Sequence, residues 1–508
     1  MLGTTLLSGG DRYVALPQLL AYAALTLCVF GLARRLGLGV PEALFGALAF
    51  ATLPVVALQA SGALNDLVVA SFLAAAAVFA LRSERTSLIL VAVAIGLAVG
   101  TKFTAVLALP TLAFVVALSG QVRRLPGLAV AGACGLALGA PWYLANLVET
   151  GDLDGGLAEY GDQRADASVT SVLTTAMRLL LDLVDLSGGI APHAALYPAA
   201  GLLLVALALI HVKRLGRPSL WFAAAGLVTT SVIGIVELAD FGQRGVYKAW
   251  LLLDKPETAS WQHHFRPNTE ADTTSSWFGP LGLLLLVLGT AVVVVGWSRG
   301  RHTRVALAMA LAPWLLLLTF AVTIVWDPWR GRFLVFGVAL AAATWGVLLR
   351  LPAVAAATAA IGTVSLSLAL ANYLGKPSGL AEVWQPRDPQ FVSTDTIWGV
   401  TRSEAQGRLR PETDHAVLYT YIEAQVPERA HVAIAPVAND FLSPYFGPRY
   451  TRPISLVPSE GVVDEEAEWL VRSPKASVRR CPESWRLMLE LESGWRVERR
   501  VSEDGCIS

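Results

Sequence analysis

Residues 305–325 read VALAMALAPWLLLLTFAVTIV and contain no charged side chain. A helix needs about 20 consecutive apolar residues to cross the hydrocarbon core of a bilayer, so this segment is long enough to span it. The polar sequence WDPWRGRF follows at once, at residues 326–333. Together the two stretches predict a membrane-spanning helix with a cluster of charged residues at one of its ends.

The composition of the whole chain supports the same class of protein. Of its 508 residues, 55% are hydrophobic and only 15% are charged, and the mean hydropathy is +0.56. One water-soluble core does not hold that much apolar surface, so we expect the lipid bilayer to be the chain's main environment. The 39 basic residues equal the 39 acidic ones, which gives no indication of a nucleic-acid partner.

Further apolar runs on both sides of residues 305–325 predict about 12 transmembrane helices. Residues 88–120 indicate a hairpin of two helices that meet around Gly100, Thr101 and Lys102. The other candidate spans lie near residues 14–32, 41–60, 66–82, 126–146, 190–211, 220–238, 278–296, 331–349 and 353–374. The predicted fold class is therefore an all-α polytopic membrane bundle, to which the polar end of the chain adds a small α/β domain.

Positive charges follow every second span and set the predicted orientation, because Lys and Arg concentrate in cytoplasmic loops. The clusters are Arg34 and Arg35, Arg82 and Arg85, Arg123 and Arg124, Lys213, Arg214 and Arg217, Arg299, Arg301 and Arg304, and Arg350. We expect a multi-pass protein of the plasma (inner) membrane whose long polar loops and C-terminal domain are extracytoplasmic. The short cytoplasmic loops and the absence of a G-x-x-x-x-G-K-[ST] motif argue against ATP-driven transport.

Two regions are expected, a transmembrane domain at residues 1–375 and a soluble extracytoplasmic domain at 376–508. In the soluble domain, residues 415–425 and 439–446 predict helices and residues 431–437, 454–457 and 469–471 predict strands. Cys481 and Cys506 lie in this region, and their pairing is left open. Residues 168–187 predict an amphipathic helix on the outer membrane interface.

Ionisable residues near a membrane are candidates for function because burying them is costly. On the predicted outer side these are Asp66 beside Asn65, Lys102, Asp327, Arg330 and Arg332. A transferase that uses a polyprenyl-phosphate sugar needs a carboxylate to deprotonate the acceptor hydroxyl and cations to hold the departing phosphate. This set supplies both, although helix capping, snorkelling and headgroup anchoring stay open as alternative roles.

Five stretches carry a resemblance to a known family: LLSGGDRYVALPQ at 6–18, LQASGALND at 58–66, GLAVGTKFTAVLALP at 96–110, APWYLANLVETG at 140–151 and WDPWRGRF at 326–333. Over about residues 5–375 the chain resembles the GT-C superfamily of membrane glycosyltransferases, in its dolichyl-phosphate-mannose mannosyltransferase-like and aminoarabinose transferase-like branch. The resemblance implies transfer of a sugar from a polyprenyl-phosphate donor to a lipid, glycan or protein acceptor on the outer face of the membrane.

The resemblance also implies roles for single residues. Asp66 matches the family's acidic residue after its second loop, Lys102 the lysine of the hairpin, and Arg332 the arginine near the donor phosphate. Such enzymes place their principal acidic residue in a first external loop after a first span, and the present chain begins beyond both. Asp11 lies near that place and is the second catalytic candidate. The substrate-binding candidates are Asn65, Gln59, Lys102, Trp142, Tyr143, Asn146, Asp327, Arg330 and Arg332.

Other functions remain open at this stage. A secondary transporter or lipid flippase would have a similar number of spans, although no internal repeat is evident. A non-catalytic, truncated homologue would explain the missing first span and loop. No cofactor is predicted, and a divalent metal at Asp66, Asp327 or the pair His263 and His264 is left open. The donor sugar, the acceptor and the oligomeric state are not indicated by the sequence.

Overall fold

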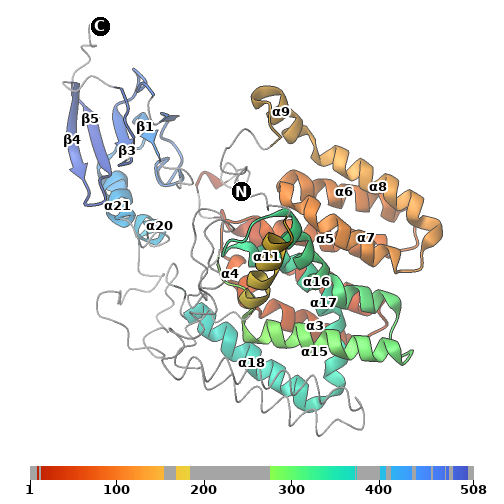
Figure 1. The fold of residues 1–508 in the computed structure, drawn as a ribbon. Helices are drawn as coiled ribbons and strands as arrows, with labels where there is room; N and C mark the ends of the chain where they lie inside the picture. The colour runs from red at the N-terminus through yellow and green to blue at the C-terminus, as the bar shows by residue number, and fades with distance from the viewer. Residues whose placement is uncertain are drawn as a thin grey trace. The chain divides into compact units, whose positions relative to one another are not determined.

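The computed structural model describes residues 8–10, 13–153, 168–183, 275–371, 373, 401–407, 414–436, 442–458, 461–474, 476–479 and 484–501. The chain divides into two compact units, one made of residues 17–372 and the other of residues 1–16 and 373–508. The first unit is helical and the second contains the sheet (Figure 1).

The helical unit is a bundle in which helices distant in sequence lie side by side (Figure 1). α6 lies between α5 and α8, and α17 lies against α3, α15 and α16. Its α-helices are α2 (Leu16–Arg35), α3 (Val40–Ala51), α4 (Pro54–Gln59), α5 (Asp66–Ala80), α6 (Thr86–Thr101), α7 (Leu109–Ala117), α8 (Leu125–Gly139), α9 (Pro141–Thr150), α11 (Val169–Asp182), α15 (Gly279–Ser298), α16 (Arg304–Thr323), α17 (Val335–Trp345) and α18 (Pro352–Ala371). Short 3₁₀ helices are η1 (Phe103–Ala108), η2 (Val122–Arg124), η6 (Arg330–Leu334) and η7 (Gly346–Arg350).

Within the described residues, four helices are long and apolar enough to cross a membrane: Leu16–Arg35, Leu281–Ser298, Arg304–Thr323 and Arg330–Arg350. A fifth arises if the bent pair α8 and α9 forms one span. These helices identify the chain as an integral membrane protein. The predicted number of about 12 spans is not confirmed. The predicted spans at 190–211 and 220–238 lie outside the described residues.

Two of the predicted spans are not continuous helices. Residues 41–60 form α3 and α4, which are separated where Pro54 begins α4. Residues 126–146 form α8 and α9, which meet at an angle of 49° where Pro141 begins α9. Proline lacks the backbone N–H that would continue the preceding helix. Leu53 before Pro54 is extended, as is usual before proline, whereas Ala140 before Pro141 keeps helical angles. The predicted hairpin at Lys102 is confirmed, since α6 ends at Thr101 and η1 begins at Phe103.

Small residues allow α6 and α8 to approach closely. A Cβ atom added at Gly135 would lie 2.7 Å from the Ala92 carbonyl oxygen and 2.8 Å from Ile95 Cβ. A Cβ atom at Gly139 would lie 2.9 Å from the carbonyl oxygen of Gly96. Such close backbone contact is typical of helices that associate within a membrane, and here it fixes the position of the helix that ends at Lys102.

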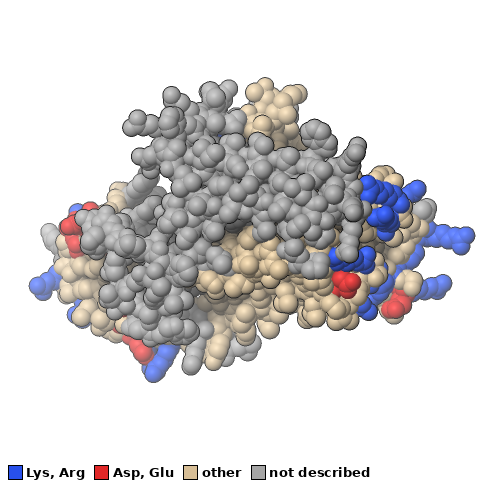
Figure 2. Space-filling model, turned by 90° about the horizontal axis from the view of Figure 1, so that it is seen from below, with Lys and Arg blue, Asp and Glu red and all other residues tan. Residues whose placement is uncertain are grey.

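The two ends of the helical unit carry different charged residues. Arg35 donates to the carbonyl oxygen of Leu81 at 3.1 Å, and Arg124 donates to that of Glu84 at 3.1 Å. Both contacts lie where α5 ends and α6 begins, whereas Asp66 starts α5 at the opposite end. The predicted basic clusters of these loops thus share one end of the bundle. Figure 2 shows a group of Lys and Arg at the right-hand edge of one face, and further charged side chains at its left-hand edge.

The second unit has a five-stranded sheet in the order β2-β1-β3-β5-β4 (Figure 1). The strands are β1 (Val432–Ala435), β2 (Ile454–Leu456), β3 (Trp469–Arg472), β4 (Trp485–Glu490) and β5 (Arg496–Arg500), and the helices are α20 (Arg402–Gly407) and α21 (His415–Gln425). β1 pairs in parallel with β2 and β3, and β5 is antiparallel to β3 and β4. The expected α/β class, the helix at 415–425 and the three expected strands are confirmed. The expected helix at 439–446 is wrong in its described part, because residues 443–450, which include Pro444 and Pro448, form turns.

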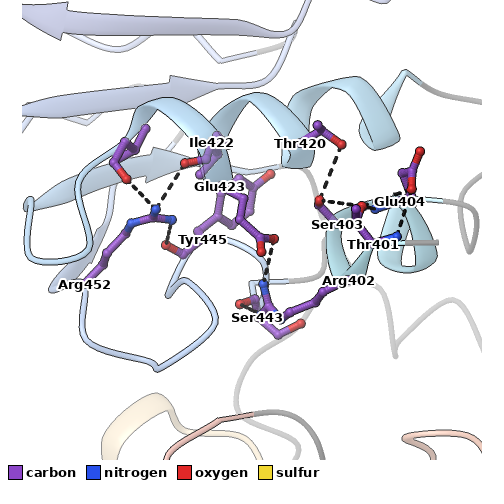
Figure 3. Close-up of polar contacts among 11 residues, drawn as sticks. Thr401, Arg402, Ser403, Glu404, Thr420, Ile422, Glu423, Ser443, Tyr445 and Arg452 are labelled. Carbon is purple, nitrogen blue, oxygen red and sulfur yellow. Dashed lines mark hydrogen bonds and ion pairs between the residues drawn. The ribbon is translucent and has the colours of Figure 1, made fainter. Parts of the chain in front are cut away.

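Arg452 ties the end of α21 to the turn that follows β1 (Figure 3). The guanidinium is buried and donates to the carbonyl oxygens of Ile422 at 3.1 Å, Val426 at 2.5 Å and Pro427 at 3.0 Å. These carbonyls belong to the last turn of α21 and the residues after it, where few backbone N–H groups are available; those of Ile422 and Pro427 also accept from the N–H groups of Val426 and Ala430. Arg452 therefore satisfies the end of α21 and has a structural role.

Candidate active site

Three charged side chains from separate elements meet at one end of the helical unit. Lys102 Nζ lies 2.6 Å from Asp66 Oδ1, and Arg332 Nε lies 3.6 Å from Asp66 Oδ2. Asp66 begins α5, Lys102 lies between α6 and η1, and Arg332 lies in η6. The sequence predicted all three residues as candidates. The structure brings them together although Asp66 and Arg332 are 266 positions apart in the sequence.

The burial of the three groups is uneven. The Asp66 side chain is 3% exposed, whereas those of Lys102 and Arg332 are 23% and 18% exposed. Burial lowers the pKa of the Lys102 ammonium, and the nearby carboxylate of Asp66 acts in the opposite direction. The carboxylate is thus enclosed, and the two cations that hold it are the groups that an incoming ligand reaches first.

A cavity opens beside these charges and has apolar walls. It is shallow and partly open to solvent, and its volume is about 20 Å³, measured as the space open to the centre of a water molecule. Its polar lining comes from Asp66, Lys102, Thr104 and Arg332. The remaining lining residues are Val69, Ala70, Leu73, Ala105, Ala108, Phe320, Phe333 and Phe336. The arrangement suits an amphiphile with an anionic head and a hydrocarbon tail, because cations and apolar side chains adjoin in one space.

The ring of Phe333 lies next to the cations. Lys102 Nζ is 4.2 Å from the ring centroid, and the guanidinium carbons of Arg332 and Arg330 are 5.3 Å and 5.5 Å from it. Distances below about 6 Å permit cation–π attraction. Sequence reasoning missed Phe333 as a functional residue. The signal was its position directly after two arginines in WDPWRGRF.

Asp327 and Arg330 form a buried ion pair of their own. Arg330 Nη2 lies 2.7 Å from Asp327 Oδ2, and both side chains are 5% exposed. Asp327 Oδ1 also accepts from the backbone N–H of Trp329 at 2.8 Å, and Arg330 donates to the carbonyl oxygen of Val325 at 3.3 Å. These contacts shape the turn between α16 and η6. Both residues were predicted to bind substrate; neither lines the cavity, and their contacts lie in the turn that precedes Arg332.

The amphipathic helix α11 holds the same turn through Trp326. The indole N–H donates to Asp182 Oδ2 at 2.5 Å, and the Arg178 guanidinium lies 5.4 Å from the ring. Arg178 and Trp326 are almost fully buried, whereas Leu173 on the other face of α11 is 64% exposed. The predicted helix is confirmed, and its polar side faces the protein.

The other predicted site residues are placed less closely. Asn65 donates to the carbonyl oxygen of Thr101 at 3.4 Å, which links it to the turn beside Lys102. Gln59 is fully buried, and its amide has no hydrogen-bond partner among the described residues. Neither side chain lines the cavity described above.

The residues predicted on α9 lie mostly at its surface. Tyr143 donates to the carbonyl oxygen of Val99 at 2.7 Å and packs edge-on against Phe103, the neighbour of Lys102. Trp142 is 71% exposed, and Asn146 donates to the carbonyl oxygen of Leu153 at 3.3 Å. Tyr143 therefore adjoins the site, and no described contact joins the other two to it.

No group of three His, Cys, Asp or Glu side chains suited to a metal is present in the described part of the chain. Asp11, His263, His264, Cys481 and Cys506 lie outside that part. In the sheet unit, His431 Nε2 is 3.2 Å from Ser455 Oγ and 3.8 Å from Asp464 Oδ2. Both partners meet the same ring nitrogen, whereas a catalytic relay uses the two nitrogens separately. His431 therefore fits a structural role.

The fold and the site define an integral membrane protein with a cationic cavity at one end of a helical bundle. Residues 1–144 match the model of the dolichyl-phosphate-mannose-protein mannosyltransferase family, a stretch that contains Asp66 and Lys102. This match confirms the resemblance to the GT-C superfamily of membrane glycosyltransferases. Arg332 lies outside the matched residues.

Comparisons with curated protein sequences and with solved structures give less information than the family match. No curated protein sequence matches the chain. Among solved structures, the chain is similar to the crystal structure of ArnT from Cupriavidus metallidurans bound to undecaprenyl phosphate, at 14% sequence identity and a TM-score of 0.38. The alignment covers 97% of this chain and 85% of that chain. A similarity of this size is too weak to establish a common fold.

Proposed function

We propose that this chain is a glycosyltransferase that moves a sugar from a polyprenyl-phosphate donor to a lipid, glycan or protein acceptor on the outer face of the membrane. The observation that carries the proposal is the position of Lys102 and Arg332 at a cavity with apolar walls. A polyprenyl-phosphate sugar has a phosphate that cations bind and a hydrocarbon tail that apolar side chains accommodate. The family match over residues 1–144 is in keeping with this donor class.

The charge at the cavity fits such a donor. Lys102 and Arg332 contribute two positive charges and Asp66 one negative charge, which leaves a net charge of +1 among the described lining residues. Asp327 and Arg330 neutralise each other. A sugar linked through one phosphate carries a single negative charge. Binding it would therefore neutralise the site, which matters where burial makes unpaired charge costly.

In the proposed reaction an acceptor hydroxyl attacks the anomeric carbon of the sugar. The bond between that carbon and the phosphate oxygen breaks, and its electron pair leaves with the phosphate. Lys102 and Arg332 stabilise the charge that grows on the departing phosphate, because hydrogen-bond donors aimed at developing charge lower the barrier. Arg332 can hold two phosphate oxygens through its planar guanidinium, whereas Lys102 acts as a compact charge.

The role of Asp66 follows from its contacts. Each of its carboxylate oxygens faces one cation, Oδ1 toward Lys102 and Oδ2 toward Arg332. A carboxylate whose two oxygens are both engaged by cations is held in place and in turn positions those cations. We therefore assign Asp66 a positioning role and keep Asp11 as the candidate for the base that takes the acceptor proton.

The experiment is a donor-consumption assay with the purified full chain in proteoliposomes. Polyprenyl-phosphate sugars of several kinds are supplied with membrane lipids of the host as acceptors, and free polyprenyl phosphate is measured by mass spectrometry. We expect release from at least one donor, and about a hundredfold slower release with K102Q or R332Q, as when one donor to a developing anion is removed. Equal release from wild type and both variants would leave the transferase proposal without support and favour a transporter or non-catalytic homologue.

A further inference from the structure

The cations of the site share an aromatic neighbour as well as a carboxylate. Lys102, Arg330 and Arg332 all lie within 5.5 Å of the centroid of the Phe333 ring. Three like charges around one side chain repel one another, and only Asp66 and Asp327 offset them in the described part of the site. The negative face of an aromatic ring is a further source of attraction for these cations.

An aromatic ring differs from a carboxylate in what it leaves free. A ring attracts a cation without accepting a conventional hydrogen bond, so N–H groups held beside it stay available to a ligand. Lys102 donates one of its three ammonium protons to Asp66 at 2.6 Å. Arg332 makes no hydrogen bond to any described residue, and its Nε lies 3.6 Å from Asp66. Most N–H donors of both residues are thus uncommitted.

We propose that Phe333 is a positioning residue that keeps Lys102 and Arg332 beside the cavity with their donors ready for a phosphate group. This inference rests on the proposed function and deepens it. Asp66 fixes one side of each cation, and the ring fixes another while adding no charge. A second carboxylate at position 333 would compete with the phosphate for the same donors, which explains why an aromatic side chain suits this place.

The chain offers a matched control. Phe320 lines the same cavity, and its ring centroid lies 6.0 Å from that of Phe333. No cation lies over the Phe320 ring among the described residues, whereas three lie near Phe333. Leucine at either position keeps an apolar wall of similar size. Loss of the aromatic face matters for the cations only at position 333.

The test compares two lipid probes, undecaprenyl phosphate and the uncharged undecaprenol, bound to the full chain in nanodiscs and quantified by native mass spectrometry. For F333L we expect the preference for undecaprenyl phosphate over undecaprenol to fall about tenfold, because the ring that attracts Lys102 and Arg332 is lost. F333Y keeps the aromatic face and should retain the preference for the phosphate. F320L should change the affinity for the two lipids by the same factor.

The outcomes separate the two proposals. If wild type prefers undecaprenyl phosphate and F333L keeps that preference, the role of Phe333 is refuted while the phosphate site stands. The role of Phe333 is also refuted, while the phosphate site stands, if F333Y loses the preference for undecaprenyl phosphate as fully as F333L does. If wild type shows no preference for the phosphate, both proposals fall. Should F333L not fold, F333M removes the ring with an unbranched side chain and serves the same comparison.

Discussion

Replacing Lys102 with methionine is the sharpest perturbation of the charged cluster. The substitution keeps a long unbranched side chain and removes the ammonium that lies 2.6 Å from Asp66. The Asp66 carboxylate is 3% exposed and would keep only Arg332, at 3.6 Å. Removing one partner of a buried pair costs about 3–5 kcal/mol. Because Arg332 remains, we expect K102M to lower the free energy of unfolding by about 3 kcal/mol, the lower end of that range.

The double variant D66N/K102M isolates the interaction. It removes the Asp66 carboxylate together with the Lys102 ammonium. The loss of Lys102 then no longer leaves a buried carboxylate without its closest cation. We expect it to be more stable than K102M by about 1–3 kcal/mol, the usual cost of leaving a buried polar group without its partner. Its affinity for undecaprenyl phosphate should nevertheless stay low, because the cation is absent.

Stability is measured by titrating SDS into the full chain in mixed micelles and following the circular dichroism of the helices. Binding is measured in parallel with undecaprenyl phosphate. If K102M is as stable as wild type, the pair with Asp66 does not hold the site together. If D66N/K102M is less stable than K102M, the charges are not coupled as the geometry requires.

Three further substitutions test other parts of the account. R332K keeps the charge but loses the planar guanidinium, so we expect about tenfold weaker binding of undecaprenyl phosphate in the same assay, and equal binding would refute the role of Arg332. W326F removes the N–H that Asp182 accepts, so hydrogen exchange of α11 should become faster by roughly tenfold, and unchanged exchange would show that Trp326 does not secure that helix. G135A should lower the thermal stability because its Cβ would lie 2.7 Å from the Ala92 carbonyl oxygen. G132A is the control and should not lower it, because a Cβ at Gly132 meets nothing within 4 Å. Equal effects of the two substitutions would contradict the close packing of α6 and α8.

The helices of the bundle were largely predictable because long apolar runs have few alternatives in a membrane. The hairpin at Lys102 and the helices over residues 279–298 and 304–323 follow the expected spans closely. The breaks before Pro54 and Pro141 were missed because hydropathy alone does not register the N–H that each proline lacks. A span is therefore better predicted when prolines within apolar runs are weighed separately.

The charged residues of the site could be predicted from the sequence, whereas the side chains that pack around them could not. Asp66, Lys102 and Arg332 stand out because ionisable residues beside apolar spans are costly to bury and so are candidates for function. The partners of Trp326 and Phe333 depend on how α11, η1 and η6 meet, and no local pattern encodes that. The pairing of Asp327 with Arg330, three residues apart, is local, whereas the approach of Arg332 to Asp66 is seen only in three dimensions.

The central claim is that Lys102 and Arg332 bind the phosphate of a polyprenyl-phosphate lipid. The most direct measurement is a cryo-electron microscopy map of the full chain in nanodiscs with undecaprenyl phosphate. The account predicts phosphate density within hydrogen-bond distance of Lys102 Nζ and the Arg332 guanidinium, with the lipid tail along Leu73 and Phe336. Density for the phosphate elsewhere, or a cavity that stays without lipid at saturating concentration, would contradict it.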